Sequence, residues 1–118
     1  MAFVCGGDAN VALGNLSVIC GGARNIAATI GPDGIPSSLT SVFGAHDSEA
    51  QGPFSSVFGG FLNRTTGHTA QIFGGQENAS EGFLSTVTGG RQNTASGSYS
   101  AVSGGEGNTA AHMVPLSS

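Results

Sequence analysis

The feature that most restricts the fold of this chain is a short phrase that recurs at a spacing of fifteen residues. In each copy a β-branched residue is followed, two positions later, by glycine. Every interval between copies is fifteen residues except one, which holds eight extra residues that map to 29–38. The β-branched residues that anchor the seven copies are Val4, Ile19, Val42, Val57, Ile72, Val87 and Val102. Such self-similarity predicts one structural unit repeated along an axis, with one inserted loop.

Other positions of the unit also keep their chemistry. The sixth residue after the anchor is Asn in every copy but one, where Ser48 stands, and a small residue follows two places later. Gly-Gly in the unit disfavours a helix, and a period of fifteen does not fit a heptad. The alternating segments S-x-V-x-G and N-x-A-x-G therefore predict two short strands per unit, joined by glycine-containing corners.

Stacking such units pairs each strand with its copy in the next unit. The sequence thus predicts an all-β chain, a parallel β-solenoid or β-roll of about seven fifteen-residue coils with two short strands in each. The whole chain, 1–118, is one domain, with an insertion loop at 29–38, a tail at 111–118, and coils that start near positions 4, 19, 42, 57, 72, 87 and 102. We expect glycine, and next to it the Asn column, to supply the left-handed conformations of the corners, and the Asn amides to bond neighbouring backbone.

The inner space of such a coil is thin, and most large apolar side chains fall on the outer face of its first strand. Soluble monomers avoid exposed apolar stripes, so we expect other chains to cover this one. Three copies around a common axis would do so with closed symmetry, and an even number of chains would also satisfy the argument. The residues that we assign to this oligomer interface are Phe43, Phe58, Phe73, Phe54, Leu16, Leu39, Leu84, Tyr99, Cys5 and Cys20.

Two long stretches, SSVFGGFLNRTTGHTAQIFGGQENASEG and STVTGGRQNTASGSYSAVSGGEGNTA, resemble the head repeats of YadA-like trimeric autotransporter adhesins. Those repeats follow approximately the pattern S-x-A-x-G-x-x-A-x-A-x-G, and similar repeats occur in phage and other tail-fibre proteins. The resemblance covers roughly residues 3–110. It implies a left-handed parallel β-roll, a homotrimer, and a head that presents a binding surface.

Composition narrows the classes of partner. A net charge of −4 provides no cationic surface for nucleic acid or anionic lipid, and no apolar run has the length of a membrane span. No basic-then-apolar leader opens the sequence. We expect a location outside the cell, at the cell surface or in a virion fibre, with no membrane insertion by this segment.

The insertion is the one break in a regular surface, and loops inserted in solenoids often carry recognition. Its apolar and stiff residues are therefore candidate ligand-binding residues, although a tolerated loop or packing on a neighbouring chain would explain them too. These residues are Ile30, Pro32, Asp33, Ile35 and Pro36.

Cys5 and Cys20 occupy one column in adjacent coils. A disulfide between them is geometrically possible but strained by the parallel side-chain directions, so we expect two buried free thiols. The three histidines fall in different columns, which disfavours a metal site. Asp8, Asp47, Glu77 and Glu106 follow the Gly-Gly corner and could form an acidic edge.

The serine column (Ser17, Ser55, Ser85 and Ser100) has no His and Asp partners in register, so we expect no enzyme and no cofactor. The leading hypothesis is a non-enzymatic trimeric head or fibre segment that attaches to a surface protein or a glycan through several copies of a weak site. The alternative is a solenoid whose flat face binds ice or another lattice, which would need threonines aligned in rows.

Overall fold

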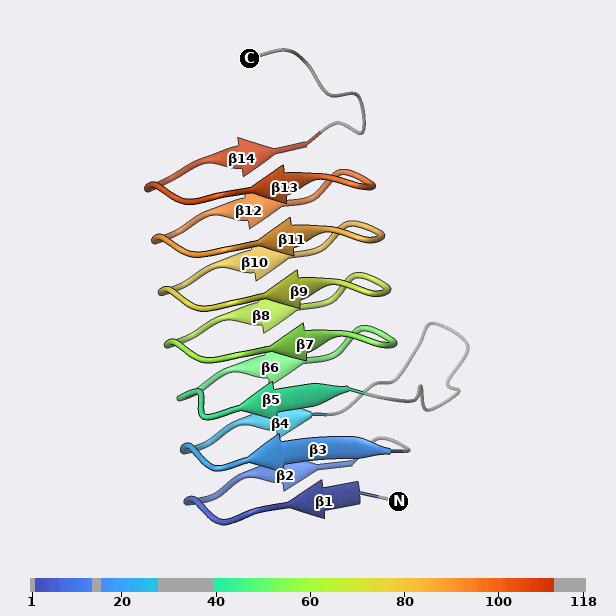
Figure 1. The fold of residues 1–118 in the computed structure, drawn as a ribbon, viewed down its shortest axis with the longest axis vertical. Coiled ribbons are helices and arrows are strands. Elements are labelled where there is room, and N and C mark those ends of the chain that lie inside the picture. The colour runs from blue at the N-terminus through green and yellow to red at the C-terminus, as the bar shows by residue number, and fades with distance from the viewer. Residues whose placement is uncertain (1, 14–15, 28–39, 112–118) are drawn as a thin grey trace.

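The structure, a computed structural model, describes residues 2–13, 16–27 and 40–111, and these residues form a parallel β-solenoid (Figure 1). The first sheet faces the reader in Figure 1, with its strands pointing left, and the second sheet lies behind it, with its strands pointing right. The molecule measures 42 × 28 × 14 Å, and its short dimension is the direction through both sheets.

Within the described residues each sheet has seven strands, and the chain alternates between the sheets. The first sheet contains β1 (Ala2–Val4), β3 (Ser17–Cys20), β5 (Ser41–Phe43), β7 (Ser56–Val57), β9 (Gln71–Ile72), β11 (Thr86–Val87) and β13 (Ala101–Val102). The second contains β2 (Val11–Ala12), β4 (Ile26–Ala27), β6 (Glu49–Ala50), β8 (Arg64–Thr65), β10 (Ala79–Ser80), β12 (Thr94–Ala95) and β14 (Thr109–Ala110). From β1 to β13 the chain completes about six turns, so the predicted solenoid with two strands per coil is confirmed.

The pairing register is the sequence period itself. Val57 pairs with Ile72 and Thr65 pairs with Ser80, each fifteen residues apart, in parallel. The same columns also pair on either side of the insertion: Ile19 pairs with Val42, and Ala27 pairs with Ala50. The eight extra residues therefore leave the stacking of the flanking coils unchanged.

The apolar centre of the solenoid receives one strand side chain from each sheet per coil, and the buried Asn and Ser columns flank it. The anchors Ile19, Val42, Val57, Ile72 and Val87 are fully buried, and Ala27, Ala50 and Ala95 meet them from the second sheet. The apolar core falls into two clusters, separated where buried Thr65 and Ser80 replace alanine in the second sheet. The Ser80 hydroxyl contacts the Ser85 hydroxyl at 2.6 Å, so a polar contact fills part of that break.

The Asn column forms a continuous ladder of hydrogen bonds along the corner. Asn78 Nδ2 donates to the carbonyl oxygens of Gly74 and Gly90, both at 3.1 Å, and Asn78 Oδ1 accepts the backbone N–H of Asn93 at 2.9 Å. Asn63 and Asn93 repeat this pattern one coil away on either side. Backbone bonding by the Asn amides, expected from the sequence, is therefore observed.

The conformations of the corners differ in part from expectation. Among the described residues many glycines have positive φ, but the members of the Asn column do not, and eleven other non-glycine residues do. These residues occupy two columns, one immediately before Asn and one at the opposite corner, and they are Ala9, Arg24, Asp47, Leu62, Glu77, Gln92, Leu16, Phe54, Thr69, Leu84 and Tyr99. For the column before Asn, the physical reason is that Asn must point its amide inward, so the turn is made by the residue before it.

A third line of pairing, which the sequence did not reveal, runs along the Gly-Gly corner. Single residues form parallel bridges from coil to coil, as Phe61 does with His46 and Gln76. The line extends from Asp8 to Glu106. Among residues 2–13, 16–27 and 40–111, no helix has the length and hydrophobicity needed to cross a membrane.

Candidate functional site: the outer face of the first sheet

The outer face of the first sheet carries a column of stacked aromatic rings. Phe43, Phe58 and Phe73, here called the phenylalanine ladder, stand directly above one another because their strands pair in register. Their ring centroids are 5.3 and 5.0 Å apart, within the range of favourable aromatic contacts. The three residues are nevertheless 39–44% exposed, so the chain alone leaves a substantial part of each ring in contact with water.

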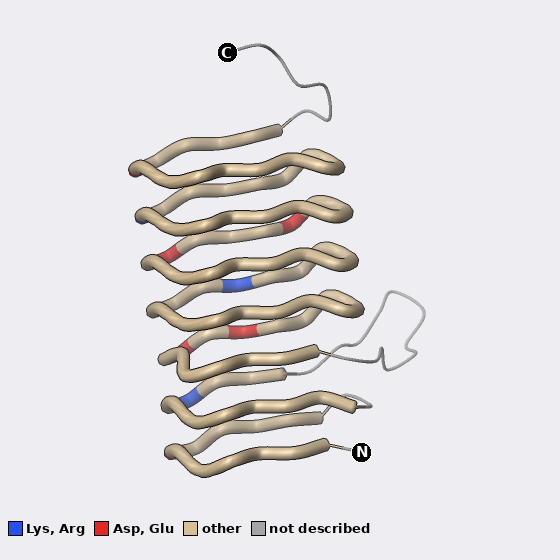
Figure 2. The backbone as a smooth tube through the Cα atoms, in the orientation of Figure 1, with Lys and Arg blue, Asp and Glu red and all other residues tan. Residues whose placement is uncertain are grey.

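This face also lacks charge. None of the seven strands of the first sheet contains Asp, Glu, Lys or Arg, whereas the second sheet contains Glu49 and Arg64. Figure 2 shows the described charges confined to the rear strands and the corners. Burying an uncharged face requires no desolvation of ions, so this face is better suited to contact with another chain than the second one is.

A second group of rings lies at the corner that leads into the first sheet. Phe54, His68, Phe83 and Tyr99, here called the corner aromatic cluster, contact one another in sequence at centroid distances of 5.6, 5.3 and 5.8 Å. Tyr99 is 60% exposed. Phe54 and Tyr99 were assigned to the interface from the sequence, whereas the ring contacts of His68 were not predicted.

Three leucines were also assigned to the interface from the sequence. Leu16 and Leu84 are exposed near the same corner, with positive φ like Phe54. Leu39 lies outside the described residues. At the opposite corner His46 stacks on Phe61 with centroids 5.1 Å apart. All the described apolar residues that were assigned to the interface are thus exposed on the single chain.

Cys5 and Cys20 extend the column of the phenylalanine ladder toward the N-terminal end, since Cys20 pairs with Phe43. Both are free thiols. The expectation that they are buried is wrong, because Cys5 is exposed and Cys20 is half-buried. The reason is that both residues belong to the outward-facing column of the first sheet, in which Phe43 is also exposed.

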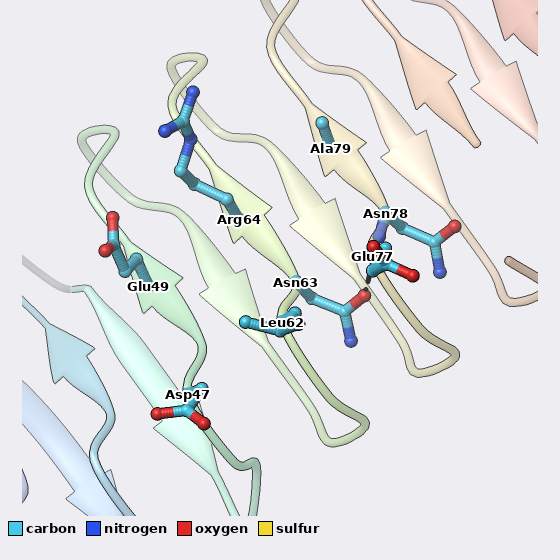
Figure 3. Close-up of a pocket in the computed structure, with 8 residues that line it drawn as sticks. All are labelled: Asp47, Glu49, Leu62, Asn63, Arg64, Glu77, Asn78 and Ala79. Atoms are coloured by element: carbon cyan, nitrogen blue, oxygen red, sulfur yellow. Dashed lines mark hydrogen bonds between the residues drawn. The ribbon is translucent and has the colours of Figure 1, made fainter. Parts of the chain in front are cut away.

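A shallow pocket of about 380 Å³ lies on the outside of the second sheet (Figure 3). Its lining combines carboxylates, a guanidinium and an apolar side chain, from Asp47, Glu49, Leu62, Asn63, Arg64, Glu77, Asn78 and Ala79. Asp47 already pairs with Arg24 at 2.9 Å, and Glu49 accepts a bond from Gln51 at 2.7 Å. The two Asn amides are committed to the Asn ladder, so few groups in the pocket are free to bind a ligand.

The predicted acidic edge is not continuous. Asp8 and Glu106 lie in the bridge column, while Asp47 and Glu77 lie in the neighbouring column of positive φ. Arg24 and Arg91 stand among them. Within the described ranges no three His, Cys, Asp or Glu side chains come together as a metal site would require.

The serine column faces inward. Ser55 Oγ donates to the Gly52 carbonyl at 2.6 Å, and Ser85 Oγ donates to the Gly82 carbonyl at 2.8 Å. Both side chains are fully buried, so these hydroxyls tie the corner together. The threonines are divided between the inside and the outside: Thr65 is buried, and on the outer face of the second sheet only Thr94 and Thr109 pair as neighbours within residues 40–111.

The candidate ligand residues Ile30, Pro32, Asp33, Ile35 and Pro36, and also His112, lie outside the described residues. Comparison with protein-family models, with curated proteins and with solved structures finds no match. The arrangement of the chain's own residues is therefore the basis for any functional conclusion.

Proposed function

We propose that this chain is a non-enzymatic structural and binding module that works as a homotrimer, with the outer faces of three first sheets packed around a common axis. The observation that carries the proposal is the phenylalanine ladder on a sheet face without charge. An isolated chain would expose this contiguous apolar surface to water, and packing against identical faces would remove it.

The small core of one chain also favours association with other copies. With a thickness of 14 Å, its buried interior is small: the large aliphatic side chains in it are the Val and Ile anchors, and most other buried residues are Ala, Ser, Thr or Asn. Intermolecular burial of Phe43, Phe58 and Phe73 would add apolar contact that this thin core lacks. A left-handed coil, as in YadA-like heads, is supported by the course of the chain in Figure 1. The chain runs to the left in the front sheet, returns to the right in the rear sheet, and climbs from the N-terminus at the bottom.

In this proposal the second sheets face outward and present three equivalent surfaces to a host or cell-surface protein or glycan. Rigid presentation of several weak sites raises the overall affinity without any new contact. The setting would be extracellular, as part of an adhesin-like head or a tail fibre. Binding of ice or another lattice is the alternative, and the single threonine pair on the outer second sheet gives it less support.

The oligomeric state tests the proposal directly. Sedimentation equilibrium should give about three times the chain mass of 11.6 kDa. Phe58→Lys would place an ammonium group within the ladder and should yield a folded monomer. Thr94→Lys, on the outer face of the second sheet, is the matched control and should remain trimeric. A monomeric wild-type chain at high protein concentration would overturn the proposal.

The ligand needs a separate assay. A glycan and matrix-protein array probed with the wild-type protein and with Phe58→Lys should show binding that weakens when the trimer is lost. Inhibition of ice recrystallisation by Phe58→Lys as strongly as by the wild type would favour the lattice-binding alternative instead.

A further inference from the structure

The two cysteines are neighbours across the first pair of strands. Val4 pairs with Ile19, and the N–H of Cys5 donates to the Ile19 carbonyl at 2.8 Å, so Cys5 lies level with Cys20. Paired strands lie about 4.8 Å apart, and residues at equivalent positions point to the same side of the sheet. Disulfides span Cα separations of roughly 4.4–6.8 Å, so this spacing falls within their range.

Both thiols are available for reaction. Cys5 is exposed, Cys20 is half-buried, and neither is engaged in a disulfide. Partial desolvation, followed by the proximity of the Cys20 thiol and a hydrogen bond with it, raises the pKa of the Cys5 thiol. The contact between the two side chains shows that they share one small patch of surface.

We infer that Cys5 and Cys20 form a dithiol site that a low-molecular-weight disulfide, such as oxidised glutathione, converts into an intramolecular disulfide linking the first two coils. The inference concerns two coils of one chain before it associates. The proposed trimer would cover the column that contains both cysteines, so the reaction is expected on the unassembled chain, which the Phe58→Lys variant should keep in solution.

The reaction consists of two thiol–disulfide exchanges. The Cys5 thiolate attacks one sulfur of oxidised glutathione, which forms a mixed disulfide and releases one glutathione thiolate. The Cys20 thiolate then attacks Cys5 Sγ, which forms the protein disulfide and releases the second glutathione. Each leaving thiolate takes up a proton, so two protein thiols are oxidised by two electrons and one glutathione disulfide is reduced to two thiols.

Intact mass spectrometry of the reduced full chain treated with oxidised glutathione tests the site. The wild type should lose the mass of two hydrogen atoms, carry no lasting glutathione adduct and run as a single chain on a non-reducing gel. Both thiols should become unreactive toward an alkylating reagent at the same rate.

Two single variants complete the design. Cys20→Ser should accumulate a glutathione adduct on Cys5, because the resolving thiol is gone, and Cys5→Ser should form any adduct on Cys20 more slowly, because that side chain is less exposed. Circular dichroism should confirm that both variants retain β structure. Lasting glutathione adducts on the wild type, disulfide-linked dimers, or thiols that remain open to alkylation would each overturn the inference.

Discussion

The backbone N–H of Asn93 donates to Oδ1 of Asn78, 2.9 Å away, so a side chain of one coil replaces a backbone acceptor for the next. Both residues are buried, and the bond repeats from Asn63 to Asn78 and from Asn93 to Asn108. The side-chain amides therefore supply, at this corner, hydrogen bonds between coils that backbone carbonyls supply elsewhere.

Removing one amide should destabilise the solenoid. Asn78→Ala loses two donated bonds and one accepted bond. It leaves the buried Asn93 N–H without its acceptor and the Gly74 carbonyl without the Asn78 amide, while the Gly90 carbonyl keeps its bond from the Gln76 N–H. We expect a loss of about 2–4 kcal/mol in the free energy of unfolding, measured by urea denaturation.

Asn78→Ser provides the matched comparison. Ser48 occupies this column naturally, and its Oγ accepts the N–H of Asn63 at 3.2 Å. The serine variant should recover part of the loss, because one of the three bonds can form again. Equal destabilisation by alanine and serine would show that the amide contacts contribute little.

The two glycines of one corner should respond differently to alanine. Gly90 has φ +91°, and a Cβ there would overlap the Gly105 carbonyl oxygen and the Asn93 amide. Gly89 faces open space at the position of its missing Cβ. Gly90→Ala should cost at least about 2 kcal/mol, while Gly89→Ala should stay within about 1 kcal/mol of wild type. Thermal and urea unfolding of the two variants at one protein concentration will check this difference.

Replacing some of the residues with positive φ by glycine should maintain or raise the stability of the fold. Gln92 has φ +57° and an exposed side chain, and Gly107 already fills the same position of the last coil. Because a left-handed non-glycine residue costs about 1–2 kcal/mol, Gln92→Gly should leave stability unchanged or raise it by up to about 1 kcal/mol. Thr94→Gly, within a strand, should instead lower it. Denaturation midpoints that fall equally in both variants would contradict the prediction.

The raised pKa of Cys5 predicts a particular pH dependence. Less thiolate is present at neutral pH than in a free cysteine, so alkylation of Cys5 by iodoacetamide should reach half its maximal rate at a higher pH than in an unfolded peptide. Because the folded state disfavours the thiolate, this group stabilises the fold below the unfolded pKa. That contribution disappears as the pH rises through the folded value.

Cys20 contributes to the shift, so its replacement supplies the control. In Cys20→Ser the midpoint for alkylation of Cys5 should move down toward that of the peptide, because the neighbouring thiol no longer disfavours the charge. Identical profiles in the two proteins would show that Cys20 does not influence Cys5.

The period of fifteen was sufficient to predict the solenoid, the columns and the location of the insertion, because parallel stacking translates sequence spacing directly into contacts. It did not identify the left-handed residues. Leu62 and Glu77 adopt positive φ because the Asn that follows each of them must point inward, and that requirement belongs to the stacked coil and not to Leu or Glu.

Ring contacts that stay within one column follow from the period of fifteen, whereas contacts between columns do not. Phe58 and Phe73 are fifteen residues apart, but Phe54 reaches His68 and Phe83 reaches Tyr99 by crossing to an adjacent column. Such offsets depend on the direction of each side chain at the corner. The uncharged character of the first sheet, by contrast, could have been found by reading the strand sequences alone.

The unbroken pairing of Ile19 with Val42 and of Ala27 with Ala50 separates two kinds of evolutionary freedom in this chain. Substitutions within a coil must satisfy the copies above and below, whereas the segment between residues 27 and 40 joins two coils that already fit each other. Its length and chemistry can therefore change without altering the scaffold, which makes this segment a natural place for specificity to diversify and for a foreign peptide to be grafted.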